Sequence, residues 1–296
     1  MILALDVGGT FIKWAVADGY ELLKQGKIPT PQESFETFAE GIQKIFDANK
    51  EYDFEGMAIS YPGMEDPKTG LLVPFGALTF GLNQPMKKML EERFRLPVSF
   101  ENDGRLAALA EAELGTLKGI ESGYVLVIGT GIGGAFVRNG KVENGYHGYG
   151  GQISLYLVDD IRKQKLNAIF SAHNGMPGFL AHAAEELGEK DISGETFMAL
   201  VKEGHPKAAM LLDEYMDAFT NVLFSLQMLL DPQRFVIGGG ISADTLFMET
   251  MQRKYEEIYK MFGIEVAHAD IVSCKYRNTS NIMGALVLYH KEHPEQ

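Results

Sequence analysis

The 296-residue sequence contains a single cysteine, Cys274. One thiol can neither close an internal disulfide nor build a zinc site from several thiolates, so the fold needs no oxidising compartment. The sequence also lacks any apolar run near the ~20 residues that a membrane-spanning helix needs. Its first apolar residues, Ile2 to Leu5, follow no basic segment and end at Asp6, which predicts a first strand rather than a signal peptide. These absences favour a soluble, cytoplasmic protein.

Positive charge is scarce as well. The chain carries 27 lysines and arginines against 40 acidic residues, a formal net charge of −13. This balance disfavours a broad basic surface for the phosphate backbone of nucleic acids. It does not exclude a small anionic ligand, because a turn of backbone N–H groups can hold phosphate locally. We therefore expect a small-molecule partner, and neither nucleic acid nor a membrane.

Glycine, in contrast, is abundant, and several of the 33 glycines stand in a pattern that occurs twice. Each copy consists of an apolar strand, a glycine turn, a second strand and an Asp-Gly or Asn-Gly pair, and that pair is typical of a hairpin. The copies lie about 120 residues apart, which indicates an internal duplication. The first covers residues 2–7, 8–10, 11–17 and 18–19, and the second covers 124–128, 129–134, 135–138 and 139–140.

The other segments fit alternating helices and strands. The chain length suggests two domains, and no low-complexity linker separates them. The best boundary lies in or after the helix predicted at 106–114. Helices are predicted over 35–46 with Ser34 as the cap, and over 86–94, 106–114, 207–230 and 283–290, and strands are predicted over 56–60, 97–100 and 235–237.

The first candidate site follows the first strand. Asp6-Val7-Gly8-Gly9-Thr10 places a carboxylate before two glycines. Glycines let backbone N–H groups approach a phosphate, while the acid can face a metal ion. The alternative interpretation is an ordinary glycine turn with a solvated aspartate.

The second candidate is Gly129-Thr130-Gly131-Ile132-Gly133-Gly134, which matches the pattern G-x-G-x-x-G. A dinucleotide site needs a helix directly after these glycines, but residues 135–140 indicate a strand and a hairpin. This disfavours a dinucleotide oxidoreductase. Two such glycine turns facing each other would suit a triphosphate, whereas the alternative is a pair of tight hairpins.

The third candidate is Glu101-Asn102-Asp103, just before the helix predicted at 106–114. An aspartate in this position often only caps the helix. Alternatively, Asp103 accepts a proton from a substrate hydroxyl and Asn102 fixes neighbouring hydroxyls. The residues alone leave both interpretations open.

Taken together, four segments resemble the ROK family of sugar kinases, in the actin-like ATPase superfamily. They occur in the family's order over nearly the whole chain. The segments are ALDVGGTFIK at 4–13, ENDG at 101–104, VIGTGIGGAFVRNGK at 127–141 and DPQRFVIGGGIS at 231–242.

The resemblance implies an α/β fold of two actin-like (ribonuclease H-like) domains, each a mixed β-sheet flanked by helices, with the active site in the cleft between them. The domains would be 1–115 with 284–296, and 116–283. ATP would be the donor, Mg²⁺ the metal, and a sugar hydroxyl the acceptor. A homodimer is also implied.

The resemblance further assigns roles by position. Asp103 would be the catalytic base, and Asp6 would hold Mg²⁺ through water. The sugar would be contacted by Asn102 and by the rim at Gly63 and Gly76. The nucleotide would be contacted by Gly8, Gly9, Thr10 and Lys13 in the first turn, by Thr130, Gly131 and Gly133 in the second, and by Gly238, Gly239 and Gly240 near the adenosine.

Departures from the family pattern concern the sugar site. Where the family has Gly-Glu-Ile-Gly-His followed by a cysteine-rich zinc loop, this chain has Gly151-Gln152-Ile153-Ser154-Leu155 and no cysteine cluster. We therefore expect no structural zinc and an altered contact through Gln152, an amide in place of a carboxylate. His147, in the same stretch, could replace a lost sugar contact, although loop histidines are more often only solvated.

A further departure is Arg105, two residues after the proposed base. If it pairs with Asp103, it would lower the pKa of that carboxyl and weaken the base. If it points outward, it has no effect.

The sequence thus predicts an ATP-dependent kinase acting on a hexose or hexose derivative, at the 6-hydroxyl. The alternative is a sugar-binding sensor of the same fold with little catalysis. A DNA-binding repressor is disfavoured, because the first glycine turn begins at Gly8 and leaves no room before it.

Overall fold

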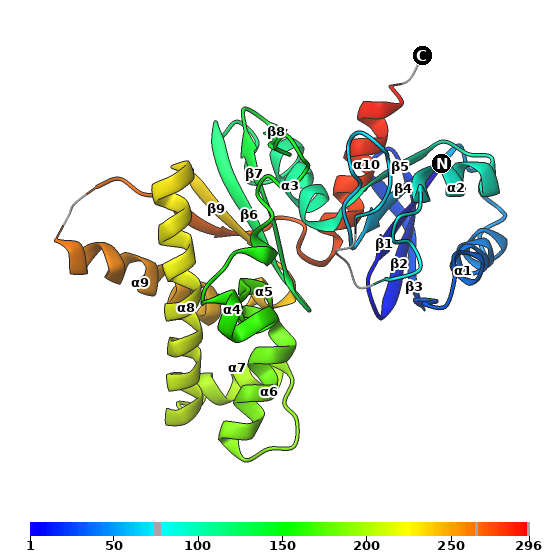
Figure 1. The fold of residues 1–296 in the computed structure, drawn as a ribbon. Coiled ribbons are helices and arrows are strands. Elements are labelled where there is room, and N and C mark those ends of the chain that lie inside the picture. Colours follow the sequence, from blue (N-terminus) through cyan, green and yellow to red (C-terminus); the bar gives the residue numbers. More distant parts are fainter. Residues whose placement is uncertain (74–77, 264–265, 295–296) are drawn as a thin grey trace. The chain divides into compact units, whose positions relative to one another are not determined.

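The computed structural model describes residues 1–73, 78–263 and 266–294, apart from the side chain of His173 (Figure 1). The chain divides into two compact units. Unit 1 comprises Met1–Glu113, Asn144–Gly150 and Thr279–Gln296, and unit 2 comprises Leu114–Glu143 and Gly151–Asn278. The domain boundaries expected near residues 115 and 283 stay a prediction.

Unit 1 is built on a five-stranded mixed sheet in the order β3-β2-β1-β4-β5. The first three strands are antiparallel neighbours. The predicted hairpin between β2 and β3 is present, with Gly19-Tyr20 as its turn, one residue later than the predicted Asp18-Gly19. Strands β1, β4 and β5 run parallel. The strands are β1 (Ile2–Val7), β2 (Phe11–Asp18), β3 (Glu21–Pro29), β4 (Gly56–Tyr61) and β5 (Val98–Asn102).

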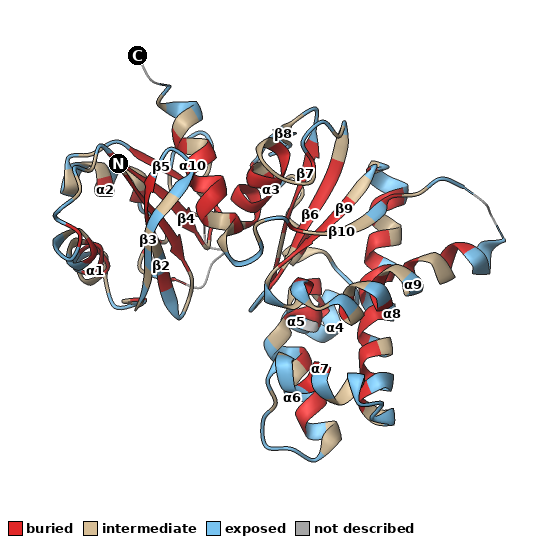
Figure 2. Cartoon of the chain, turned by 180° about the vertical axis from the view of Figure 1, so that it is seen from behind, coloured by how far each residue is buried: buried red, intermediate tan, exposed pale blue. Residues whose placement is uncertain are grey.

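Helices cover this sheet and bury its central strands. Every residue of β1 and β4 is buried (Figure 2). Phe38 and Ile42 of the first helix join Leu3 and Leu5 of β1 in one apolar core, and Ser34 caps that helix as predicted. The last helix packs against α3 and the parallel strands. The helices of unit 1 are α1 (Phe35–Asp47), α2 (Met86–Phe94), α3 (Asp103–Glu113) and α10 (Ser280–Glu292).

Unit 2 repeats the same plan. Its sheet has the order β10-β9-β6-β7-β8, in which β6, β7 and β8 are antiparallel and β6, β9 and β10 are parallel. Read from β8, this is the arrangement of the first sheet, which confirms the duplicated plan. The strands are β6 (Ser122–Ile128), β7 (Ile132–Arg138), β8 (Lys141–Val142), β9 (Arg234–Gly238) and β10 (Asp270–Ser273).

The second core lies between this sheet and the long helices α8 and α9. Sequence reasoning predicted α8 but not the short helices between residues 153 and 202. The helices are α4 (Ile161–Gln164), α5 (Phe170–Asn174), α6 (Met176–Leu187), α7 (Gly194–Lys202), α8 (Pro206–Leu230) and α9 (Thr245–Phe262). Short 3₁₀ turns are η1 (Ile153–Leu155), η2 (Lys165–Ala168), η3 (Gly240–Ala243) and η4 (Arg277–Thr279).

The two mixed sheets flanked by helices confirm the predicted α/β class. Most predicted elements agree with the structure to within two or three residues, and the helix predicted from residue 106 begins earlier, at Asp103. Within the described part of the chain, no helix has both the length and the apolar character that a membrane span requires.

The close approach of α10 to α3 yields a stability prediction. Gly284 of α10 lies so close to α3 that an added Cβ would collide with the carbonyl oxygen of Leu106. The backbone of α3 cannot move away from an added methyl group without disturbing the helix. We therefore expect Gly284→Ala to lower the free energy of unfolding, measured by urea denaturation, by about 1–3 kcal/mol. The matched control is Gly194→Ala at the start of α7, where the nearest atom is 3.9 Å away. Equal stabilities of the two variants would contradict the packing argument.

Candidate active site

Asp103 stands where β5 runs directly into α3, and the side chain of Asn102 organises this junction. Oδ1 of Asn102 accepts hydrogen bonds from the backbone N–H groups of Gly104 at 3.0 Å and Arg105 at 3.3 Å. Its Nδ2 donates to the carbonyl oxygen of Gly63 at 2.9 Å. Asn102 therefore caps α3 and ties it to the chain after β4. The capping role considered for Asp103 belongs chiefly to its neighbour.

The Asp103 carboxyl is perturbed in the direction that a base requires. Burial, and to a smaller extent the negative charge of Asp6, raise its pKa to about 6. The Gly104 N–H, which donates to Asp103 Oδ1 at 2.8 Å, opposes this rise because it stabilises the charged form. A carboxylate whose pKa lies closer to neutrality is a better proton acceptor than an ordinary aspartate, yet it is still ionised at pH 7.

Asp6 is the penultimate residue of β1 in the same unit, and three donors hold it. Its Oδ1 accepts from Ser60 Oγ at 3.1 Å and from Asn281 Nδ2 at 2.9 Å, and its Oδ2 lies 3.3 Å from Lys13 Nζ. The sheet register explains two of these contacts, because Asp6 pairs with Lys13 on β2 and with Ser60 on β4. Sequence reasoning missed Ser60 and Asn281, since only the strand pairing and the folding back of α10 bring them to Asp6.

The surroundings of Asp6 fit a hydrated metal ion better than a direct protein cage. Among the described residues, no group of three or more histidine, cysteine, aspartate or glutamate side chains is placed to hold a metal. Mg²⁺ commonly keeps several waters and binds one or two carboxylates together with substrate phosphates. Asp6 is a buried carboxylate beside the turn Gly8–Thr10, whose glycines are half-buried and whose Thr10 is exposed, and it fits that role.

The turn after β1 presents backbone donors. The carbonyl oxygens of Gly8 and Gly9 accept from Thr30 Oγ1 at 2.7 Å and Gln32 Nε2 at 2.5 Å, and that of Thr10 accepts from the Thr30 N–H at 3.0 Å. The N–H groups of Gly9 and Thr10 donate no hydrogen bond within the described part of the chain. With its carbonyls engaged, this turn offers N–H groups to an anion.

The corresponding turn of unit 2 lies between β6 and β7. The carbonyl oxygen of Gly129 accepts from the Met176 N–H at 2.9 Å, and Ser171 Oγ accepts from the Ile132 N–H at 3.0 Å. These bonds fix the exposed Thr130 beside the N-terminus of α6, whose dipole favours negative charge. The element after the turn is the strand β7, which rules out the helix that a dinucleotide fold requires here.

The third glycine segment lies at the same edge of the second sheet. Strands β6 and β9 run parallel with Val127 opposite Gly238, so Gly239 follows the strand where the turn after β6 begins. Gly239 has φ +91°, and a Cβ there would collide with the backbone of Ile128. Gly240 beside it is exposed. Gly133, in contrast, lies within β7 and takes part in the ladder rather than in the turn.

The predicted sugar contacts fall in both units. Gly63 and His147 belong to unit 1 with Asp103, whereas Gln152 precedes η1 in unit 2. His147 is exposed, and its ring lies 4.8 Å from that of Tyr146, edge to face. Gly76 lies outside the described residues.

Both alternatives considered for Arg105 are wrong. Its side chain neither points outward nor pairs with Asp103, because it is buried and donates to Glu101 Oε1 at 3.1 Å. A second guanidinium nitrogen donates to the carbonyl oxygen of Gly148. The cation is therefore neutralised by Glu101, and the base keeps its raised pKa.

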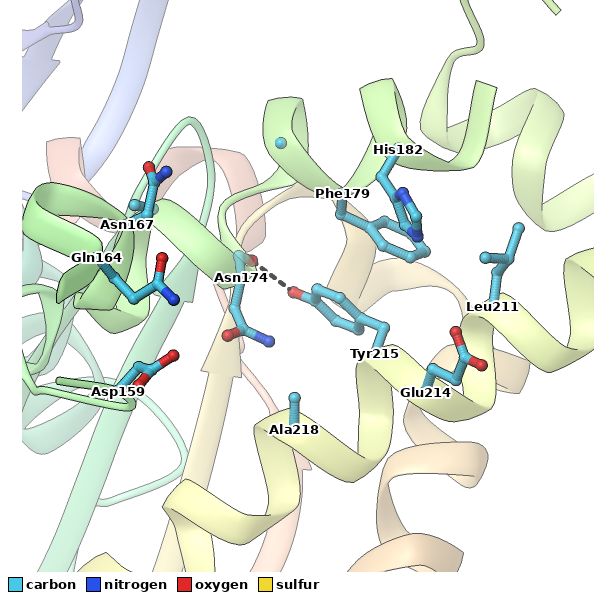
Figure 3. A pocket seen from close by; sticks show the side chains of 12 residues that line it. Asp159, Gln164, Asn167, Asn174, Phe179, His182, Leu211, Glu214, Tyr215 and Ala218 are labelled. Atoms are coloured by element: carbon cyan, nitrogen blue, oxygen red, sulfur yellow. Dashed lines mark hydrogen bonds between the residues drawn. The ribbon is translucent and has the colours of Figure 1, made fainter. Parts of the chain in front are cut away.

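A separate pocket of about 550 Å³ lies wholly within unit 2, between α4, α5, α6 and α8 (Figure 3). The Tyr215 hydroxyl donates to the carbonyl oxygen of Asn174 at its floor, at 2.8 Å. None of the predicted site residues lines it.

The raised pKa of Asp103 predicts a stability cost. The folded state holds the proton more tightly than the unfolded chain, so stability falls as the pH rises from about 4 through about 6. Asp103→Asn removes this cost, and at pH 8 we expect it to raise the free energy of unfolding by about 1–3 kcal/mol. The gain should vanish toward pH 4 in urea titrations.

The matched control for this measurement is Asp66→Asn. The backbone N–H groups of Lys68 and Thr69 donate to Asp66 and lower its pKa, so the same substitution there should reduce stability at pH 8. An Asp103→Asn variant no more stable than the wild type at pH 8 would contradict the assignment of a raised pKa.

Comparison with known proteins shows which family the chain resembles in sequence and in fold. The model of the ROK family matches residues 2–292. The chain is 30% identical to a beta-glucoside kinase of Listeria innocua over 98% of its length and 96% of the relative, and 30% identical to an N-acetyl-D-glucosamine kinase of Vibrio atlanticus over 97% and 99%. A ROK family protein from Streptococcus pneumoniae, solved in complex with sucrose, superimposes with a TM-score of 0.85 at 28% identity over 98% of both chains. The chain belongs to the ROK family.

Proposed function

We propose that this protein is an ATP-dependent sugar kinase that transfers the γ-phosphoryl group of ATP to the 6-hydroxyl of a hexose or hexose derivative. The observation that carries the proposal is the placement of Asp103. Its pKa is raised to about 6, it opens α3, and it shares unit 1 with Asp6 and the N–H-presenting turn Gly8–Thr10. A proton acceptor and a phosphate cradle are the two parts that phosphoryl transfer needs.

In the proposed reaction, Asp103 orients the sugar hydroxyl and takes its proton as the oxygen attacks the γ-phosphorus. Asn102 contributes chiefly by holding Asp103, because its Oδ1 and one amide hydrogen are used within the protein. The Asn102 side chain also hydrogen-bonds to the Asp103 carboxyl, which favours its charged form. Because the transition state of phosphoryl transfer is loose, correct positioning and charge neutralisation supply most of the rate enhancement.

The phosphates are held by backbone donors in this proposal. The N–H groups of Gly9 and Thr10, together with Lys13, serve one side of the nucleotide. The turn at Thr130 and Gly131 serves the other, and the open backbone at Gly239 and Gly240 accommodates the adenosine. When bound, a divalent cation, Mg²⁺ in this proposal, neutralises charge on the phosphates. Asp6 would hold it through water.

The acceptor in this proposal is a sugar with a substituent. The two relatives named above are a beta-glucoside kinase and an N-acetyl-D-glucosamine kinase, and both of these sugars carry a substituent that a free hexose lacks. Gln152 carries a neutral amide, a group that both donates and accepts hydrogen bonds, in place of the family's carboxylate. A cytoplasmic homodimer, implied by the family resemblance, completes the proposal.

Turnover against a panel of sugars tests the proposal. ADP release should depend on ATP, Mg²⁺ and one class among free hexoses, N-acetylated amino sugars and β-glucosides. Asp103→Asn should reduce kcat by at least about 100-fold, because it removes the general base. Calorimetry should show that the same variant still binds ATP.

The control for that experiment is Asp217→Asn, an exposed carboxylate of α8 that pairs with Lys254. This variant should keep full turnover. Sugar binding without any ADP release by the wild type would support the sensor instead, and undiminished turnover by Asp103→Asn would remove Asp103 as the base.

The pH dependence of the reaction follows from the same carboxyl. Asp103 must be ionised to accept a proton, so kcat/KM should fall about tenfold per pH unit below about pH 6. The measurement is kcat/KM for the best sugar between pH 5 and pH 8, with coupling enzymes in excess. A profile that stays flat down to pH 5 would contradict the assignment.

A further inference from the structure

Arg105 occupies an unusual position for a cation, two residues after the proposed base and buried to 7% exposure. Its Nη1 donates to Glu101 Oε1 at 3.1 Å, and its Nη2 donates to the Gly148 carbonyl oxygen and lies 4.0 Å from Met64 Sδ. The guanidinium thus links the end of β5 to segment 144–150, which lies far along the chain but belongs to the same unit.

Only an arginine can make both links from this position. A buried cation is tolerated when it is paired and its donors are used, and Arg105 meets that condition through one carboxylate and one carbonyl. The planar guanidinium directs its N–H groups along fixed, separate directions, so two acceptors can be served at once. A lysine ammonium would keep the charge but not this geometry.

The hydrogen bond from Arg105 to the Gly148 carbonyl oxygen holds segment 144–150 at Gly148. Gly148 is buried with φ +79°, and a Cβ there would lie 3.5 Å from Pro67 Cδ and 3.7 Å from the Glu65 carbonyl oxygen. The segment is also closed on itself, because the Gly150 N–H donates to the carbonyl oxygen of Asn144 at 2.9 Å. Between these fixed points, the backbone has little freedom.

The side chains just before Gly148 are exposed. Tyr146 is 77% exposed and His147 is exposed beside it, with the two rings edge to face. Lys68 Nζ lies 4.9 Å from the centroid of the Tyr146 ring, which adds a cation on one side. An aromatic face with neighbouring donors suits the apolar face and hydroxyls of a sugar or of a group attached to it.

We propose that Arg105 is a positioning residue for sugar selectivity: it fixes segment 144–150 at the α3 end that carries Asp103, so that Tyr146 and His147 meet the sugar substituent remote from the reacting hydroxyl. This inference rests on the proposed kinase function and assigns the residues that select a substituted sugar over a free hexose. Arg105 itself does not touch the sugar.

Steady-state kinetics of Arg105→Lys test the inference. The sugar KM for a substituted sugar such as a β-glucoside should rise about tenfold, which corresponds to about 1.4 kcal/mol, while the KM for ATP stays within about twofold. The ratio of kcat/KM between the β-glucoside and free glucose should fall by a similar factor. A purely structural role would lower the melting temperature without changing this ratio. Arg93→Gln, an exposed arginine of α2 in the same unit, is the matched control.

A second set of variants keeps the test valid if Arg105→Lys folds poorly. Tyr146→Ala and His147→Ala change exposed side chains and should leave the melting temperature unchanged, but they should reduce the same selectivity ratio. In the doubly substituted background, Arg105→Lys should cause little further loss, because its effect acts through those rings. Full selectivity in the Tyr146 and His147 variants, or additive losses in the cycle, would overturn the proposal.

Failure of the kinase function would be recognised separately. If the wild type phosphorylates no sugar in the panel, calorimetric dissociation constants for the β-glucoside and glucose replace kcat/KM in the same variants. A selectivity in binding that Arg105→Lys abolishes would then support the positioning role without catalysis. An unchanged ratio of dissociation constants in a folded Arg105→Lys variant would overturn it.

Discussion

The first unit depends on one amide side chain. Asn102 caps α3 with its oxygen and reaches Gly63 with its nitrogen, so a single residue joins the end of β5, the start of α3 and the chain after β4. Asp103 is the next residue, and its carboxyl accepts a hydrogen bond from the Gly104 N–H at 2.8 Å. The bonds of Asn102 and Gly104 together hold Asp103 at the start of α3. Asn102, expected from the sequence to contact the substrate, thus also supports the proposed base.

The duplicated sheet explains why the turns proposed to bind phosphate occur twice. In each unit, a β-hairpin stands next to two parallel strands, and the hairpin turn lies where the parallel strand ends. Carbonyl groups of both turns accept hydrogen bonds within the protein, from Thr30 and Gln32 in one case and from Met176 in the other. Some N–H groups are also used internally, but those of Gly9 and Thr10 donate to no group within the described part of the chain. In the proposed kinase, duplicating the strand plan therefore also duplicates the anion site.

The sequence was informative where local rules determine the outcome. Asp18-Gly19 and Asn139-Gly140 each indicate a hairpin, and the helical spacing of apolar residues indicates α1. The sequence did not predict contacts between segments that lie far apart along the chain. Ser60 and Asn281 reach Asp6 only through strand pairing and the return of α10, and Arg105 has its partner 43 residues away at Gly148. The two interpretations considered for Arg105, pairing with Asp103 or pointing outward, were both wrong. Neither took account of the Gly148 carbonyl oxygen, which is distant in the sequence.

The placement of charge in unit 1 resolves an apparent conflict between a net charge of −13 and a phosphate ligand. Carboxylates gather near the site, and the pKa of Glu65 is raised to about 7 by burial and by the charge of Glu101, much as that of Asp103 is raised to about 6. Such groups repel phosphate unless they are neutralised. Arg105 forms an ion pair with Glu101, and Lys13 forms one with Asp6. Most of the nearby positive charge is therefore neutralised within the protein. In the proposed kinase, attraction of the nucleotide therefore comes chiefly from backbone N–H dipoles and from the cation that Asp6 would hold, and Lys13 adds to it from beside Asp6. Such a site is built from glycine turns rather than from a basic patch.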